Sequence, residues 1–84
     1  MFEVLLSRQA RRYYASVDAT VAKRLEDVFK RLESDPFPEG TAPLHGELRG
    51  FWRMRVGQYR VIYDVNERDN VIRIVRIGPR GDVY

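Results

Sequence analysis

Three strand-like runs in the second half of the chain constrain its fold more than any other feature. They span residues 51–56, 59–65 and 71–77 and are rich in β-branched and aromatic residues. Gly57 and Gln58 alone separate the first two runs, and the polar residues 66–70 separate the second from the third. Because turns this short join antiparallel neighbours, the pattern predicts a three-strand antiparallel meander.

The first half of the chain predicts one strand and two helices. Residues 2–7 are a short apolar run, and Ser7 can cap a helix over residues 8–17. Asp18 is the expected cap of a second helix, which should end at Asp35 because the residue before Pro36 disfavours helical backbone. That second helix carries one apolar stripe, which consists of Val21, Leu25, Val28, Phe29 and Leu32.

Residues 36–50 hold three prolines and three glycines, which predicts a connecting loop before the meander. The whole chain, residues 1–84, is expected to be a single α+β domain. We predict a small antiparallel sheet of about four strands, with residues 2–7 at one edge and a two-helix hairpin on one face. The other face would be left open, and a functional site is expected there.

The composition excludes several classes of protein. No apolar run approaches the ~20 residues that a membrane span needs, and there is no signal peptide pattern. The absence of cysteine rules out disulfides, thiolate nucleophiles and cysteine metal sites, so we expect a cytoplasmic protein. The net charge is +3, and all of the 15 basic residues except Lys23 and Lys30 are arginines. An RNA-binding face would favour arginine in this way, and so would a genome-wide composition bias.

Side-chain alternation predicts that arginines gather on the open face. In the first two meander strands one parity is apolar and should meet the helices, which leaves Arg53, Arg55 and Arg60 on the other side. The last strand is ambiguous because each parity mixes apolar residues with an arginine, so Arg76 is assigned to this face less directly. Like charges on one face repel each other. This favours a surface for an anion or an acidic partner over charges that merely discourage edge pairing.

Two segments carry a resemblance to a known family. They are "LHGELRGFWRMRVGQYRVIYDV" (residues 44–65) and "IRIVRIGPRGDVY" (residues 72–84). Together with the preceding strand and helical hairpin, they resemble the RelE/ParE toxin superfamily of type II toxin–antitoxin systems. RelE-like members are ribosome-dependent endonucleases that cut mRNA, inhibit translation, and need no metal or other cofactor. In their reaction the ribose 2′-hydroxyl attacks its own phosphate, leaving a cyclic phosphate and a free 5′-hydroxyl.

The resemblance implies two groups of site residues. Those expected to bind RNA phosphates are Arg53 and Arg55 and, from its place in the last strand, Arg76. Those expected to be catalytic are Arg60, Arg80 and Tyr84. Within the catalytic group the arginines would stabilise the negative charge of the phosphorane, and the terminal tyrosine would stack on or orient the flanking nucleotide.

The basic pair departs from the family pattern, because the best-known RelE ribonucleases have lysine in it. Arginine stays protonated in proteins, so Arg53 and Arg55 can clamp phosphates but take a proton poorly. The general base is therefore left open. Tyr84 qualifies if neighbouring arginines lower its pKa, and His45 has a suitable intrinsic pKa but lies in the predicted loop.

Two other functions stay open on the sequence. ParE-type members share the fold and inhibit DNA gyrase by binding it, without enzymatic activity. A third interpretation is a catalytically weak toxin whose arginine face mainly binds the antitoxin. On each interpretation a cognate antitoxin is the expected partner, in a toxin–antitoxin complex of higher order. The endonuclease would also need the ribosome and mRNA.

Overall fold

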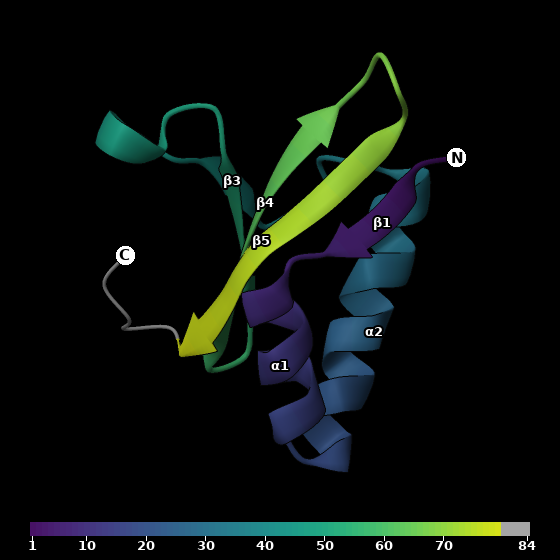
Figure 1. The fold of residues 1–84 in the computed structure, drawn as a ribbon, viewed down its shortest axis with the longest axis vertical. Coiled ribbons are helices and arrows are strands. Elements are labelled where there is room, and N and C mark those ends of the chain that lie inside the picture. Colours follow the sequence, from purple (N-terminus) through teal and green to yellow (C-terminus); the bar gives the residue numbers. More distant parts are fainter. Residues whose placement is uncertain (80–84) are drawn as a thin grey trace.

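The structure is a computed structural model, and it describes residues 1–79. The strands form one sheet in the order β1-β5-β4-β3-β2. The helices α1 and α2 lie next to each other against one face of this sheet (Figure 1). Within the described range, no helix is long and apolar enough to cross a membrane. In chain order the elements are β1 (Glu3–Leu6), α1 (Arg8–Ser16), α2 (Ala19–Ser34), β2 (Thr41–Pro43), the 3-10 helix η1 (Gly46–Leu48), β3 (Trp52–Val56), β4 (Tyr59–Asn66) and β5 (Val71–Pro79).

The predicted meander is confirmed, and the sheet differs from the prediction in two respects. β3, β4 and β5 are consecutive antiparallel neighbours, and β1 joins at an edge. However, β1 runs parallel to β5, so the sheet is mixed; no short turn joins these two strands, and their relative direction is therefore not restricted. The expected loop also contributes a fifth strand, because β2 pairs with β3. Its Pro43 is tolerated because β2 is an edge strand.

Both helices begin at the predicted caps. The Ser7 hydroxyl accepts a hydrogen bond from the Ala10 amide at 3.1 Å, and Asp18 Oδ1 accepts one from the Val21 amide at 2.9 Å. These side chains satisfy backbone donors that the first turn of a helix would otherwise leave without a partner. α2 ends at Ser34, immediately before the predicted Asp-Pro boundary.

One hydrophobic core lies between the helices and the sheet. The predicted stripe of α2 faces it, with Leu25 and Leu32 fully buried. Tyr63 of β4 is also fully buried. Its hydroxyl donates to the Pro36 carbonyl at 2.8 Å and lies 3.2 Å from the Thr41 hydroxyl. A buried hydroxyl needs such partners, and here they tie the connecting segment to the middle of the sheet.

A β-bulge decides the ambiguous face of β5. Ile62 of β4 pairs with Arg76, whereas the next residue of β4 pairs with Ile74. Val75 is therefore the extra residue, and Ile74 and Ile77 both face the core although they are three positions apart. The bulge turns Arg76 to the open face of the sheet.

Side chains at the start of α1, from its cap Ser7 and from Gln9, hydrogen-bond the part of β5 that β1 does not reach. β1 pairs with β5 only as far as Ile74. Beyond that point the Ser7 hydroxyl donates to the Val75 carbonyl at 2.8 Å. The Gln9 amide donates to the Ile77 carbonyl at 2.9 Å and accepts from the Ile77 N–H at 3.0 Å. Gln9 thus takes the place of a backbone peptide in a neighbouring strand, which holds the first turn of α1 against the sheet.

Replacing Gln9 with alanine should lower the free energy of unfolding by about 1–3 kcal/mol, because the N–H and carbonyl of Ile77 lose their partner. Urea denaturation measures the change. Gln58→Ala is the matched control, since Gln58 is exposed in the β3–β4 turn, and it should cost less than about 0.5 kcal/mol. Equal losses in the two variants would contradict the role of Gln9.

The free energy of unfolding is expected to decrease above about pH 10. Burial raises the pKa of Tyr63 above its usual value, and a hydrogen bond to Glu26 raises the pKa of Tyr14. Each tyrosine contributes fully to the free energy of unfolding below the pKa that it has in the unfolded chain. The contribution is lost as pH rises through the pKa in the folded state, because the unfolded chain ionises first. In the Tyr63→Phe variant, the temperature of thermal unfolding should fall less steeply at alkaline pH than in the wild type. A decrease as steep as in the wild type would show that Tyr63 is not its source.

Candidate phosphate-binding site

Four arginines lie on the open face of the sheet, on three adjacent strands. Arg53 and Arg55 alternate along β3 with Met54, which is buried in the core, so their side chains leave the opposite face. Arg60 of β4 is paired directly with Arg55. The bulge in β5 places Arg76 on the same face. We call these four residues the arginine cluster.

The sheet arranges the arginine cluster in two neighbouring rows. The rows, read across β3, β4 and β5, are Arg53–Ile62–Arg76 and Arg55–Arg60–Gly78. Directly paired residues have Cβ atoms about 4.5–5.5 Å apart, and residues two strands apart are separated by about 10 Å. The four guanidinium groups are therefore close enough to bind neighbouring phosphate groups of one polyanion. Gly78 adds no side chain to the row and is itself buried.

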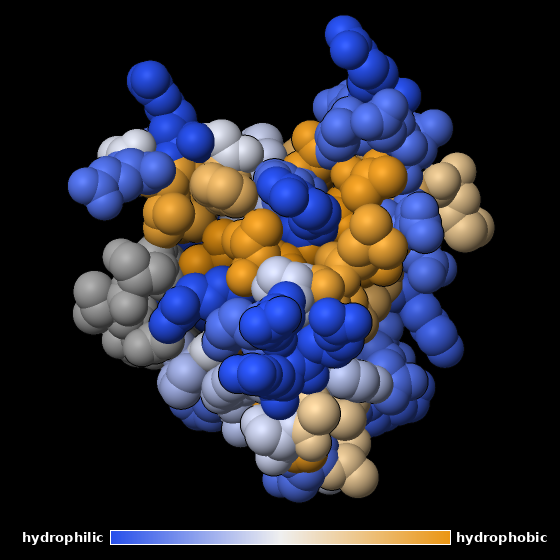
Figure 2. Space-filling model, in the orientation of Figure 1, coloured by the Kyte–Doolittle hydropathy of each residue, from blue (hydrophilic) through white to orange (hydrophobic). Residues whose placement is uncertain are grey.

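Ile62 provides an apolar floor for the arginine cluster. It points to the open face, yet only 3% of it is exposed, and it does not belong to the core on the helix side. Its cross-strand neighbours are Arg53 and Arg76, whose aliphatic stems can pack beside it. The Nε atoms of Arg60 and Arg76 are buried as well. Figure 2 shows hydrophobic surface over the strands with hydrophilic side chains lying across it. Charges held over apolar surface are screened less by water, which strengthens their attraction for phosphate.

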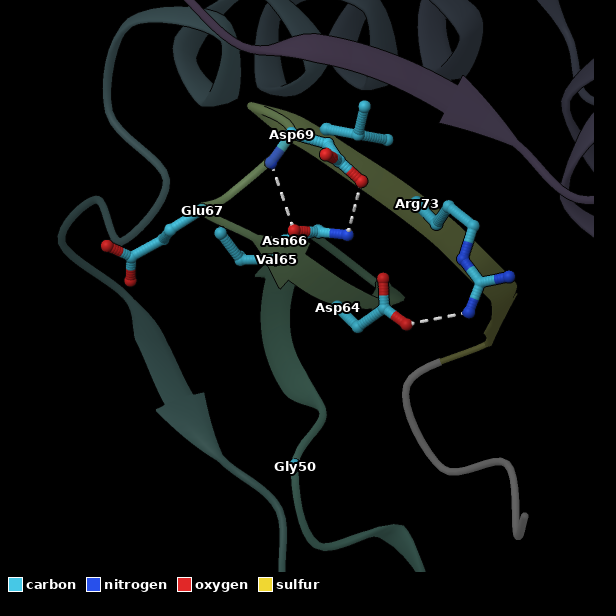
Figure 3. Close-up of a pocket in the computed structure, with 8 residues that line it drawn as sticks. Gly50, Asp64, Val65, Asn66, Glu67, Asp69 and Arg73 are labelled. Atoms are coloured by element: carbon cyan, nitrogen blue, oxygen red, sulfur yellow. Dashed lines mark hydrogen bonds and ion pairs between the residues drawn. The ribbon is translucent and has the colours of Figure 1, made fainter.

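The far end of the β4–β5 hairpin has the opposite character. A cavity of about 620 Å³ there is lined by the carboxylates of Asp64, Glu67 and Asp69. Figure 3 shows Asp64 directed at Arg73, with which it forms an ion pair at 2.8 Å, and Asn66 bonded to Asp69 at 3.1 Å. The ion pair raises the pKa of Arg73. With three carboxylates and one guanidinium group, that of Arg73, in its wall, this cavity suits a phosphate less well than the arginine cluster does.

The described part of the site supplies cations and no proton acceptor. Arginine does not deprotonate in proteins, so the arginine cluster can bind phosphates and stabilise developing negative charge only. His45 is exposed at the start of η1, beyond the end of β3 that lies away from the Arg55–Arg60 pair. The predicted catalytic residues Arg80 and Tyr84 lie outside the described residues. Among residues 1–79, no three His, Cys, Asp or Glu side chains are grouped to hold a metal ion.

Comparison with known proteins identifies the family. The sequence matches the family model of the ParE toxin of type II toxin–antitoxin systems over residues 4–84. The chain belongs to this toxin family. The superfamily predicted from residues 44–65 and 72–84 is therefore confirmed.

Individual relatives of this ParE-family toxin agree in sequence and in fold. Toxin RelG of Mycobacterium tuberculosis is 33% identical over 64 residues, which cover 76% of this chain and 72% of that protein. Toxin RelE of the same organism is 30% identical over 84 residues, covering 86% of each. The crystal structure of the archaeal RelE–RelB complex from Pyrococcus horikoshii contains a chain with a TM-score of 0.84 and 32% identity, covering 98% of both chains.

Inorganic phosphate should stabilise the folded toxin by binding the arginine cluster. At ten times the dissociation constant the gain is about 1.4 kcal/mol. Thermal unfolding in phosphate and in chloride at equal ionic strength measures it. Arg60→Gln should remove most of the gain, whereas Arg68→Gln, which removes the same charge from the exposed β4–β5 turn, should keep it. If Arg60→Gln keeps the full gain, phosphate binds elsewhere.

Proposed function

We propose that this toxin is a ribosome-dependent endonuclease that cuts mRNA by attack of a ribose 2′-hydroxyl on the neighbouring phosphate. The observation that carries the proposal is the arginine cluster, in which three strands direct four guanidinium groups to one open face. Similarity to toxins named RelG and RelE, at 33% and 30% identity, supports it.

The arginines divide the work of binding and charge stabilisation. Arg53, Arg55 and Arg76 bind the phosphates on either side of the scissile bond, because a guanidinium fork can make two parallel hydrogen bonds to one phosphate. As the 2′-oxygen attacks, negative charge grows on the phosphorane, and Arg60 and Arg80 stabilise it. The bond between phosphorus and the 5′-oxygen then breaks, and the leaving 5′-oxygen takes a proton from water to become the free 5′-hydroxyl. This stabilisation acts on the transition state more than on the bound substrate, which is the condition for accelerating the reaction.

The proton of the 2′-hydroxyl goes to a residue other than arginine. Tyr84 is our candidate, because nearby positive charge lowers the pKa of a phenol. The same side chain would stack on or orient the flanking nucleotide. His45 is disfavoured by its place beyond the far end of β3.

We further propose a cognate antitoxin as the partner that controls the toxin. The similar archaeal RelE was crystallised in a complex with RelB, and a similar chain comes from the RelBE2 toxin–antitoxin complex of Mycobacterium tuberculosis. An acidic segment of an antitoxin laid over the arginine cluster would neutralise its charge and exclude mRNA at the same time. Antitoxin and substrate would then compete for the same guanidinium groups.

Primer extension on an mRNA held in programmed ribosomes tests the endonuclease. Wild-type toxin should cut this mRNA and leave free mRNA intact. Arg60→Ala and Arg80→Ala should each lower the cleavage rate about 10²–10³-fold, the effect of removing one group that stabilises developing charge. Arg68→Ala, in the exposed β4–β5 turn, should cut at the wild-type rate.

Two outcomes would contradict parts of the proposal. A folded Arg80→Ala variant that loses less than about threefold, under 1 kcal/mol of barrier, would remove the role of Arg80. Intact mRNA together with inhibited supercoiling by DNA gyrase would make the protein a gyrase-binding toxin instead of an endonuclease.

A further inference from the structure

Helix α1 carries a second group of arginines, separate from the arginine cluster. Arg8, Arg11 and Arg12 are all exposed, and α1 contains no acidic residue. The ion pairs found within residues 1–79 lie on α2 and between β4 and β5, so none of them neutralises these three arginines. The exposed side of α2, in contrast, mixes acidic and basic residues. α1 therefore presents the positive charge of three guanidinium groups to solvent.

Two of these arginines border one hollow. It has a volume of about 390 Å³, and the described residues that line it are Arg8, Gln9, Arg12, Tyr13 and Ser16. Arg8 and Arg12 are four positions apart, which places their Cβ atoms about 5–6 Å from each other on the same side of the helix. Both guanidinium groups can therefore reach a ligand in this hollow.

The hollow lies beside the outer end of β5. Gln9, in its wall, is hydrogen-bonded to Ile77, and the ring of Tyr13 is 6.3 Å from that of Tyr59 at the start of β4. The residues next to these contacts in the two strands are Arg76 and Arg60, which point to the opposite face. The α1 arginines and the arginine cluster thus lie on opposite faces of the sheet, near the end of β5 and the start of β4.

We propose that Arg8 and Arg12 form a second RNA contact, which binds backbone phosphates of ribosomal RNA while the arginine cluster holds the mRNA. The inference rests on the proposed ribosome-dependent function and names the surface by which the toxin is held on the ribosome. Arg11, on the adjacent side of the helix, adds to the field without bordering the hollow.

Charge and surface chemistry favour RNA over a protein partner at this site. Structured RNA is recognised largely through its shape and its phosphates, which arginine forks bind bidentately. Protein interfaces depend instead on apolar or aromatic anchors that become buried. Within residues 1–79 the exposed large hydrophobic residues are Met1, Leu5 and Phe37, and none of them belongs to α1. The aromatic ring in the wall of the hollow, that of Tyr13, is half-buried beside Tyr59.

Pelleting of the toxin with ribosomes at several salt concentrations tests the inference. The ribosomes carry an mRNA with 2′-O-methyl riboses at the decoding site, so that binding is measured without cleavage. In the double variant Arg8→Gln/Arg12→Gln, the slope of log K against log salt should be smaller by about 1.4–1.8, since each phosphate contact contributes about 0.7–0.9. Arg8→Lys/Arg12→Lys keeps both charges and should restore the slope.

Lys30→Gln/Arg68→Gln is the matched control, because it removes two charges from exposed positions on α2 and in the β4–β5 turn. It should leave the slope unchanged. An unaltered slope in the Arg8→Gln/Arg12→Gln variant, or the same reduction in the control, would overturn the inference. Normal ribosome binding combined with lost antitoxin affinity would also overturn it, because α1 would then be an antitoxin surface.

A separate cleavage assay on unmodified mRNA distinguishes this inference from the proposed function. Ribosome binding with the expected change of slope, but without any cleavage, would leave the α1 contact standing and remove the endonuclease. Cleavage at the wild-type rate and wild-type salt dependence by the Arg8→Gln/Arg12→Gln variant would do the reverse.

Discussion

The rest of the structure depends on how the hydrogen-bonding groups of β5 beyond the end of β1 find partners. The pairing of β1 with β5 stops at Ile74 of β5, and a strand edge left without a neighbour would expose a row of peptide groups. Ser7 and Gln9 meet those groups with side-chain hydrogen bonds of 2.8–3.0 Å. The same bonds fix α1 to the sheet and hold the half of β5 that carries Arg76. A neutral amide on a helix therefore helps to position a cationic site on the opposite face.

The bulge at Val75 allows β5 both to fill the core and to place an arginine on the open face, which a regularly alternating strand could not do with this sequence. Ile74 and Ile77 both fill the core, and Arg76 still joins the arginine cluster. In a regular strand, residues three apart point to opposite faces, so one isoleucine would face solvent. The extra residue removes this conflict. The Ser7 hydroxyl donates a hydrogen bond to the carbonyl of Val75, the bulged residue.

Local patterns in the sequence were sufficient for β1, both helices, the three strands of the meander and most of the open face. Alternation placed Arg53, Arg55 and Arg60 correctly because β3 and β4 are regular where they pair with each other. It could not decide β5, because a bulge depends on how two strands fit together and not on either strand alone. The Gln9 contact was missed for a similar reason, since its partner is 68 positions away. β2 was missed because three residues, one of them proline, give too little periodicity to read.

The candidate site was predictable to the same extent. The charged residues of the face followed from parity, and Ile62 between Arg60 and Asp64 was visible as one apolar residue on a polar face. The near-complete burial of Ile62 could not be predicted, because it depends on neighbouring residues from two other strands. The roles of Arg80 and Tyr84 rest on family resemblance, and those residues lie outside the described part of the chain.

Charge separation, more than total charge, determines how this molecule attracts a polyanion. The net charge is only +3. The carboxylates of Asp64, Glu67 and Asp69 gather at one end of the β4–β5 hairpin, and the arginine cluster lies toward the other. A polyanion is attracted more strongly to the arginine cluster than to the carboxylate end, where Arg73 pairs with Asp64, so the field favours one orientation of the toxin before any contact forms. Orientation would matter in the proposed endonuclease, because an arginine cluster cannot take a proton and could contribute to cleavage only by holding the substrate in place and stabilising its charge.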